Sequence, residues 1–168
     1  NRRRAPGEGF KFYAWDSEYT LNSTTNDRTG VANPNTPAYL YNAARQNPEF
    51  RLMFADRVQK HMFNGGALTT ENNVQRYTQL ADEIESAIIL EAARWGDNAT
   101  TREGPTNYTR DTHWRPTRDA ILSGFFPQRP AIALQQLRNA GLFPNLDAPS
   151  FNQFGGDVTS DFDIALSG

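Results

Sequence analysis

Apolar side chains recur at intervals of three and four residues between positions 37 and 140, and this periodicity predicts a largely helical chain. Each predicted helix opens with Thr, Asn, Asp or Pro, and each ends at Gly or shortly before Pro. The predicted helices cover residues 37–46, 48–63, 70–95, 111–126 and 131–140. Pro127 is expected to break the helical run and so to separate the last two helices.

The third predicted helix carries the longest apolar stripe. The residues of this stripe are Val74, Tyr77, Leu80, Ala81, Ile84, Ala87, Ile88, Ala92 and Trp95. At 1.5 Å per residue this helix would be roughly 35–40 Å long. Short connections indicate that neighbouring helices pack antiparallel to it. We expect Trp95 and Trp114 to be anchors of the core.

The two ends of the chain follow a different pattern. Aromatic residues cluster at 10–16 and predict a β-strand, which a turn at 6–9 makes part of an N-terminal hairpin. Residues 22–36 predict an ordered or partly mobile loop. After Gly141, proline and glycine return, and the alternation at 162–166 predicts a linker followed by one or two strands. The expected fold class is mainly α with a small β element: an N-terminal hairpin, about five helices and a C-terminal extended segment.

Composition narrows the function classes. The net charge of −2 provides no field that would attract nucleic acid or an anionic membrane. The absence of cysteine excludes a disulfide scaffold, a thiolate zinc site and a cysteine nucleophile. No apolar run approaches the roughly 20 residues that span a bilayer. The low apolar content of 38%, with 12 glycines and 10 prolines, predicts substantial loop.

Asp16 and Glu18 are the candidate metal ligands. Alternate side chains of a strand share a face, so Phe12 and Ala14 would lie on the face that carries both acids. This apolar face would turn acidic at its C-terminal end. Two carboxylates placed there can bind one hard cation such as Mg²⁺. The alternative is an acid pair that caps a loop or forms ion pairs with arginine.

Other polar residues provide weaker candidates. His61 and His113 lack the paired spacing of a zinc site, and we expect them to be structural. The run at 2–4, Arg-Arg-Arg, could hold phosphate but is more typical of a solvated hairpin. No nucleophile-elbow motif or Ser–His–Asp arrangement favours a hydrolase. No catalytic residue is therefore assigned within the chain.

The segment at 15–18, Trp-Asp-Ser-Glu, is similar to the Trp-Asp-x-Asp/Glu segment of the CotH kinase family, atypical secreted or spore-coat protein kinases found largely in bacteria. Further stretches resemble the helical C-terminal portion of the large exported members; these are residues 40–51, 54–66, 125–129 and 134–138. Residues 148–156 resemble the entry into the β-sandwich module that often follows such a kinase-like domain.

This resemblance implies a fragment of a protein kinase. Residues 1–144 would be a hairpin plus the helical C-lobe of the kinase-like domain, and residues 145–168 a linker and the first strand or strands of a β-module. Asp16 would hold Mg²⁺ against the phosphates of ATP, with Glu18 as a second ligand. The nucleotide-binding lobe, the phosphate-contacting lysine and the catalytic-loop residues are expected upstream. We therefore expect no activity, and no bound Mg²⁺ or ATP, for this fragment alone.

The resemblance also implies partners and a location. The partners would be the upstream N-lobe and the downstream β-module of the same parent chain, with a protein substrate phosphorylated on Ser or Thr. The protein would be secreted or displayed on a bacterial surface. The alternative is a non-catalytic helical scaffold or adhesion module of an exported multidomain protein. A surface carbohydrate-binding role, indicated only by the 12% aromatic content and the trailing strands, ranks last.

Overall fold

The computed structural model describes residues 17, 20–30, 33–97 and 107–167, and this part of the chain is mainly helical. The first three helices are α1 (Pro37–Ala44), α2 (Pro48–Met62) and α3 (Thr70–Trp95). A helical run follows, made of η2 (Arg110–Trp114), α5 (Arg115–Ala120), η3 (Ile121–Phe125) and α6 (Phe126–Asn139). The predicted hairpin at 6–16 lies outside the described residues.

The predicted starts of the first three helices are confirmed. Pro37 and Pro48 each open a helix, where the missing N–H of proline costs no hydrogen bond. The side chain of Asn47 caps α2, because its Oδ1 accepts a 2.8 Å hydrogen bond from the N–H of Glu49. At the far end of α2, Asn64 and Gly65 have positive φ angles of 51° and 73°, which end the helix.

The prediction that Pro127 separates two helices is wrong, because the helical run continues from η3 into α6 without a gap. A proline removes one helical N–H, and its ring clashes with the carbonyl four residues earlier. The wider π-turn η3 avoids this conflict, since Phe126 donates its N–H to Ile121, five residues back. A second π-turn, η2, precedes Pro116, and there the N–H of Arg115 donates a hydrogen bond to the carbonyl oxygen of Arg110.

The start of this run also differs from the prediction. The predicted start at Asp111, which was expected to cap the helix, is wrong, because the helical run already includes Arg110. Thr109 precedes the first turn in extended conformation, and its Oγ1 accepts a 3.1 Å hydrogen bond from the N–H of Thr112. A threonine hydroxyl at this position satisfies an otherwise unpaired N–H of the first turn.

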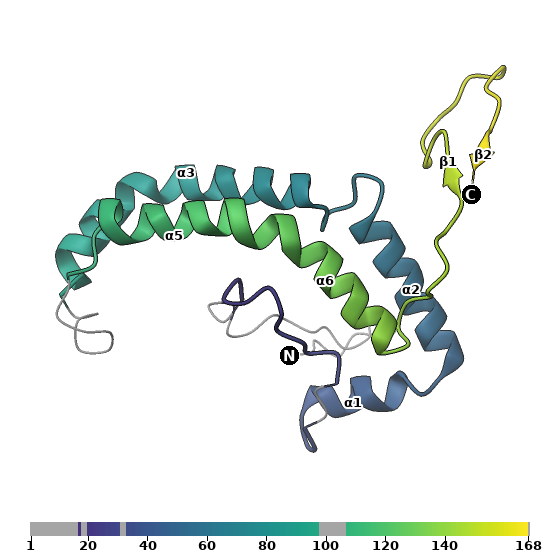
Figure 1. Ribbon diagram of the computed structural model, residues 1–168, viewed down its shortest axis with the longest axis horizontal. Coiled ribbons are helices and arrows are strands. Elements are labelled where there is room, and N and C mark those ends of the chain that lie inside the picture. Colours follow the sequence, from purple (N-terminus) through teal and green to yellow (C-terminus); the bar gives the residue numbers. More distant parts are fainter. Residues whose placement is uncertain (1–16, 18–19, 31–32, 98–106, 168) are drawn as a thin grey trace, which may run out of the picture.

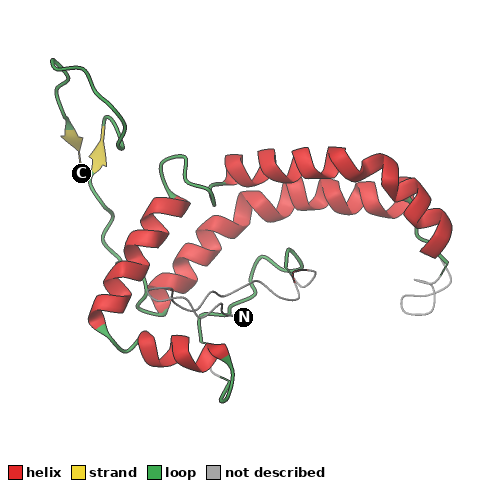
Figure 2. Cartoon of the chain, turned by 180° about the vertical axis from the view of Figure 1, so that it is seen from behind, coloured by secondary structure: helices red, strands yellow, loops and turns green. Residues whose placement is uncertain are grey.

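The helices form a long two-helix arm with a smaller cluster at one end. Figures 1 and 2 show α3 lying beside α5 along the arm, after which the run bends and α6 passes close to α2. π-turns and prolines are the usual causes of such a bend. The buried apolar side chains among the described residues are Val58, Ala81, Phe126, Leu142 and Phe143, of which Leu142 is the least exposed at 1%. Phe126 begins α6 and meets Tyr77 at 5.4 Å between ring centroids, whereas Phe143 follows the other end of α6 and stacks on Phe63 at 5.7 Å.

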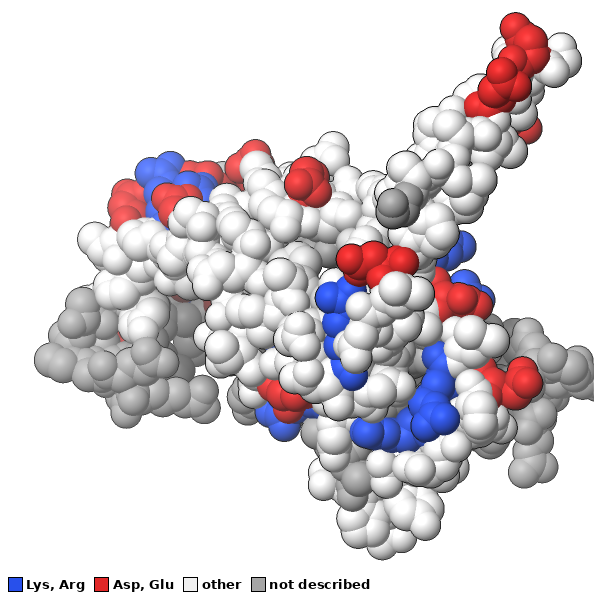
Figure 3. Space-filling model, turned by 45° about the vertical axis from the view of Figure 1, so that its right-hand side comes forward, with Lys and Arg blue, Asp and Glu red and all other residues white. Residues whose placement is uncertain are grey.

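The apolar stripe of α3 is only partly covered. Ala81 is buried, whereas Leu80 is 56% exposed and Ile84 is 49% exposed. Trp95 is also exposed, so its prediction as a core anchor is wrong. One neighbouring helix covers only one side of a cylinder, which leaves the flank of a broad stripe in solvent. On the side of the molecule drawn in Figure 3, charged side chains form separate groups between broad areas of uncharged residues.

The C-terminal segment contains the predicted extended structure in a short form. Strands β1 (Ser150–Phe151) and β2 (Leu166–Ser167) pair antiparallel and project away from the helices (Figure 1). At the base of this projection, Arg138 at the end of α6 forms a 2.6 Å ion pair with Asp147. The division of the chain between residues 144 and 145 stays a prediction. Within the described ranges, no helix is both long and apolar enough to cross a bilayer.

Candidate functional site

Asp16 and Glu18, the predicted metal ligands, both lie outside the described residues. Ser17, which stands between them in the sequence, is described and exposed. Its carbonyl oxygen accepts hydrogen bonds from the N–H of Thr20 at 3.1 Å and from the hydroxyl of Thr20 at 2.6 Å. In the sequence, the acidic segment is followed by loop 20–30, and this loop contacts the helices.

The first half of loop 20–30 is held by α6. Arg129 donates from Nη1 to the carbonyl oxygen of Thr24 at 2.6 Å, and Gln136 donates from Nε2 to that of Thr25 at 2.9 Å. Residues seven positions apart lie on the same face of a helix. One face of α6 therefore provides two side chains that reach consecutive carbonyls of the loop.

The second half of the loop is held by α1. The carbonyl oxygen of Thr29 accepts from Arg45 Nη1 at 2.6 Å and from the hydroxyl of Tyr41 at 3.3 Å. The carboxylate of Asp27 in turn accepts from the N–H and the hydroxyl of Thr29, both at 2.8 Å. These hydrogen bonds lower the pKa of Asp27 because they stabilise its ionised form. The hydrogen bond from the backbone N–H of Thr29 has the larger effect. Loop 20–30 is thus ordered by contacts from two helices.

A hollow of about 780 Å³ separates the start of this loop from the α5–α6 run. We call it the hydroxyl-lined hollow, because its polar lining consists of Ser17, Thr20, Asn22, Ser23, Thr24, Thr117 and Gln128. Hydroxyl and amide groups can both donate and accept hydrogen bonds, so this part of the hollow suits an oxygen-rich group, whereas Leu21, Ile121 and Phe125 make the rest of its lining apolar. Leu21 at its edge has a φ of 63°, a left-handed conformation that is uncommon outside glycine.

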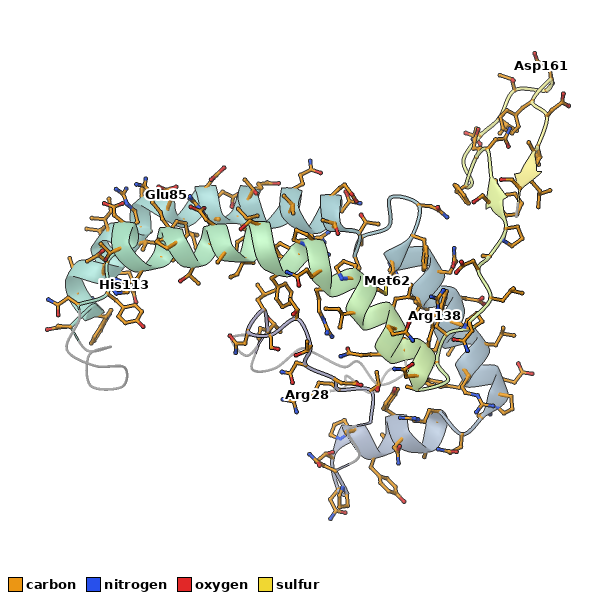
Figure 4. The ribbon with its side chains drawn as sticks, viewed as in Figure 1. Arg28, Met62, Glu85, His113, Arg138 and Asp161 are labelled. Atoms are coloured by element: carbon orange, nitrogen blue, oxygen red, sulfur yellow. The ribbon has the colours of Figure 1, made fainter. Side chains whose placement is uncertain are left out.

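A second concavity, the apolar groove, has a volume of about 480 Å³. Leu21 also lines this groove, together with side chains from α1, α2, α3 and α6 and the two arginines Arg28 and Arg129. Figure 4 shows Met62 where α2 nears α6, and Arg28 on the loop between α6 and α1. The single loop 20–30 therefore borders two concavities of different chemistry.

The arm carries the densest group of charged side chains. Glu85 on α3 accepts hydrogen bonds from the guanidinium groups of Arg115, including one of 2.8 Å from Nε, and of Arg118 at 3.2 Å. Arg115 also bonds Asp111 at 2.8 Å. The hydrogen bond from Arg115 lowers the pKa of Glu85 below its usual range. Every charge in this group has an opposite partner, so we interpret it as a clamp between α3 and α5.

His113 contributes to the turn at the end of the arm. Its Nδ1 accepts from the N–H of Thr109 at 3.2 Å, and its ring stacks on Tyr108 with the centroids 4.3 Å apart. These local contacts explain the position of the His113 side chain, and no ligand is needed to explain it. Across the ranges that the structure describes, no three His, Asp or Glu residues lie close enough to hold a metal ion. Asp16 and Glu18 lie outside these ranges, so this finding does not bear on them.

Sequence reasoning did not find the side chains that position loop 20–30. Arg129 and Gln136 are separated by two helical turns, which is the only signal that they could share a role. Their partners are backbone carbonyls more than a hundred positions away, and a carbonyl has no signature in a sequence. Comparison of the chain with protein-family models, curated proteins and solved structures finds no match.

Proposed function

We propose that this chain is the helical part of a CotH-like protein kinase, in which Asp16 and Glu18 hold Mg²⁺ against the phosphates of ATP. The Trp-Asp-Ser-Glu segment at 15–18 is the sequence basis of the proposal. Such a kinase acts in the intact parent, where an upstream lobe supplies the nucleotide-binding lysine and the catalytic loop. The expected reaction is transfer of a phosphoryl group to Ser or Thr of an exported protein substrate.

The observation that carries the proposal is the anchoring of the loop that comes next to the two acids in the sequence. Ser17 and Thr20 lead into a loop that four side chains tie to α1 and α6. Phosphoryl transfer depends mainly on positioning and charge neutralisation, so a metal-binding segment needs a rigid support. The hydroxyl-lined hollow beside Ser17 leaves room for oxygen-rich groups at this point.

The donor atoms fit the proposed metal. Mg²⁺ is commonly bound by one or two carboxylates together with water and phosphate oxygens, and Asp16 and Glu18 offer two carboxylates. When bound, the metal supplies neutralisation of the phosphate charge. The proposed part of this chain is to hold the two carboxylates at one place, next to the anchored loop 20–30.

The test is Mg²⁺-dependent ATP binding by the intact kinase-like domain, measured by calorimetry. Asp16→Asn is expected to weaken binding in Mg²⁺ by about tenfold or more, the effect of losing one strong ligand interaction. Glu18→Gln is expected to have a smaller effect. Asp56→Asn is the matched control, because Asp56 is an exposed acid on α2. Equal affinity and equal metal dependence for wild type and Asp16→Asn would refute the metal site.

A second candidate is a non-catalytic helical scaffold of an exported multidomain protein. It is favoured by the small core and by the many large apolar side chains that the described helices leave exposed. The exposed large apolar residues on α1, α2 and α3 are Tyr39, Leu40, Leu52, Met53, Leu80, Ile84, Ile89, Leu90 and Trp95. Exposed apolar surface of this extent marks contact with other layers or chains. A parent domain that folds but shows no Mg²⁺-dependent ATP binding would favour the scaffold.

A further inference from the structure

The apolar groove has the size and lining of a small-molecule site. Its volume of about 480 Å³ falls within the range of ligand pockets, about 300–1,000 Å³. Phe54 and Met62 of α2 form one wall, and Ala133 and Leu137 of α6 form the other. An aromatic cluster supports the first wall, since the ring centroids of Phe50 and Phe54 lie 6.1 Å apart. An apolar group could therefore be enclosed between two rigid helices.

The charged groups of the groove all have one sign. Arg28 and Arg129 line it, and the part of the chain that the structure describes adds no aspartate or glutamate to this lining. Among the described residues, neither arginine takes part in an ion pair. Asp27 lies within electrostatic reach of Arg129, but its Oδ1 accepts the hydrogen bonds of Thr29. The groove therefore presents positive charge beside an apolar wall.

Arg129 keeps N–H groups with which it can bind a ligand. A guanidinium has five N–H donors, and the contact of Arg129 with Thr24 is made by its Nη1. The carbonyl of Thr24 also fixes the position of Arg129 before any ligand binds. Gln136 and Asn73 add amide groups to the same lining. A charge-assisted hydrogen bond from a fixed arginine is stronger than one between neutral groups.

We propose that the groove binds a small amphipathic anion: an aromatic or aliphatic body that lies between α2 and α6, with a carboxylate, sulfonate or phosphate head held by Arg28 and Arg129. A cationic ligand is disfavoured by the two guanidinium groups, and a neutral one would leave them without a counter-charge. The groove shares Leu21 and Phe125 with the hydroxyl-lined hollow, but neither Arg28 nor Arg129 is among the described residues that line the hollow. The proposal is therefore independent of the metal site at Asp16 and Glu18.

Two fluorescent probes separate the contribution of charge from that of apolar burial in the whole 168-residue chain. Anilinonaphthalene sulfonate has an apolar aromatic body and one anionic group, and N-phenylnaphthylamine has a similar body without charge. We expect the sulfonate to bind at one site per chain, and a rise in salt from 50 to 500 mM to weaken it several-fold. Binding of the neutral probe should change little with salt.

Three substitutions assign this binding to the groove. Arg28→Gln and Arg129→Gln are each expected to weaken the sulfonate about tenfold, as loss of one charge-assisted hydrogen bond would, while changing the affinity of the neutral probe by less than about twofold. Arg57→Gln, an exposed arginine of α2 outside the groove, is the matched control. Ala133→Trp should fill the groove and remove both probes, with far-UV circular dichroism reporting whether the helices remain.

Each contrary result overturns the proposal. Unchanged sulfonate affinity in Arg28→Gln would show that charge in the groove is not recognised, and this variant leaves the Arg129–Thr24 hydrogen bond intact. Binding that survives in a folded Ala133→Trp variant would place the probe elsewhere. Failure of both probes to bind the wild-type chain would show that the groove is not a ligand site.

Discussion

The Nη1 of Arg129 on α6 donates a 2.6 Å hydrogen bond to the carbonyl oxygen of Thr24, a residue 105 positions earlier in the chain. This contact joins the loop that follows the candidate metal ligands to the longest helical run of the protein. It also holds Arg129 at the border of the apolar groove. One side chain therefore lines the apolar groove and contacts Thr24, which lines the hydroxyl-lined hollow.

Loss of this anchor should expose the loop to protease. The bond between Arg28 and Thr29 is a trypsin site inside the anchored loop. A partly buried charge-assisted hydrogen bond contributes on the order of 1.5 kcal/mol, which corresponds to about a tenfold change in the open population. Arg129→Gln should therefore accelerate cleavage after Arg28 about tenfold, as followed by mass spectrometry. Arg57→Gln should leave the rate unchanged, and equal rates for both variants would contradict the anchoring role.

Two glycines should respond in opposite directions to alanine. A Cβ added at Gly124 within η3 meets no heavy atom within 4 Å, so Gly124→Ala should stabilise the helix by about 0.5–1 kcal/mol. A Cβ at Gly96 would overlap the carbonyl oxygens of Ala92 and Tyr108. Gly96→Ala should therefore destabilise the protein by about 1–3 kcal/mol. Urea denaturation of both variants provides the measurement, and changes of the same sign would be the contrary outcome.

The segment after α6 should be part of the core although it follows the last helix. Leu142 is 1% exposed, and Leu146, four positions later, is 82% exposed. Leu142→Ala should lower the free energy of unfolding by about 2–5 kcal/mol, as large-to-small substitutions in a core do. Leu146→Ala should change it by no more than about 0.5 kcal/mol. Similar effects of the two substitutions on chemical denaturation would argue against this placement of the core.

The clamp between α3 and α5 should weaken at low pH. The hydrogen bond from Arg115 lowers the pKa of Glu85, so the folded state favours the ionised carboxylate. Its contribution should be complete above the ordinary value of 4.5 and should be lost as the pH falls through the lowered pKa. Glu85→Gln should therefore reduce the melting temperature at pH 7, with a difference from wild type that shrinks below about pH 4.5.

The control for this prediction is Glu83→Gln on the same helix. The carboxylate of Glu83 accepts a hydrogen bond from Gln79 within α3 and does not bridge to α5. The melting temperature of the Glu83→Gln variant should follow that of wild type across the pH range. A difference between wild type and Glu85→Gln that stays constant from pH 7 to pH 3 would show that the charge of Glu85 does not stabilise the helix pair.

Local signals predicted the helix starts well, because they act within one turn. Asn47 and Pro48 open α2 as expected, since a cap and an N-terminal proline satisfy the first turn without help from the rest of the fold. The role of Pro127 was predicted wrongly for a related reason. The sequence rule assumes an α-helical turn, whereas a π-turn at η3 accommodates the proline and continues the helix.

The candidate site also has one part that the sequence predicts and another part that only the structure shows. The metal ligands Asp16 and Glu18 come from a sequence pattern and stay a prediction, since they lie outside the described residues. The anchored loop, the hydroxyl-lined hollow and the apolar groove could not be predicted. Each depends on contacts such as Gln136 with Thr25, which are 111 positions apart and involve a backbone carbonyl.

The order and type of most elements were thus determined by the sequence alone, because capping, periodicity and turn chemistry are local properties of the chain. Which part of each apolar stripe becomes buried was decided by the tertiary structure. Ala81 is covered and Leu80 is not, although both belong to one stripe, because a single neighbouring helix packs against α3 along the arm. Burial depends on what lies opposite a side chain, and that is a property of the packed structure.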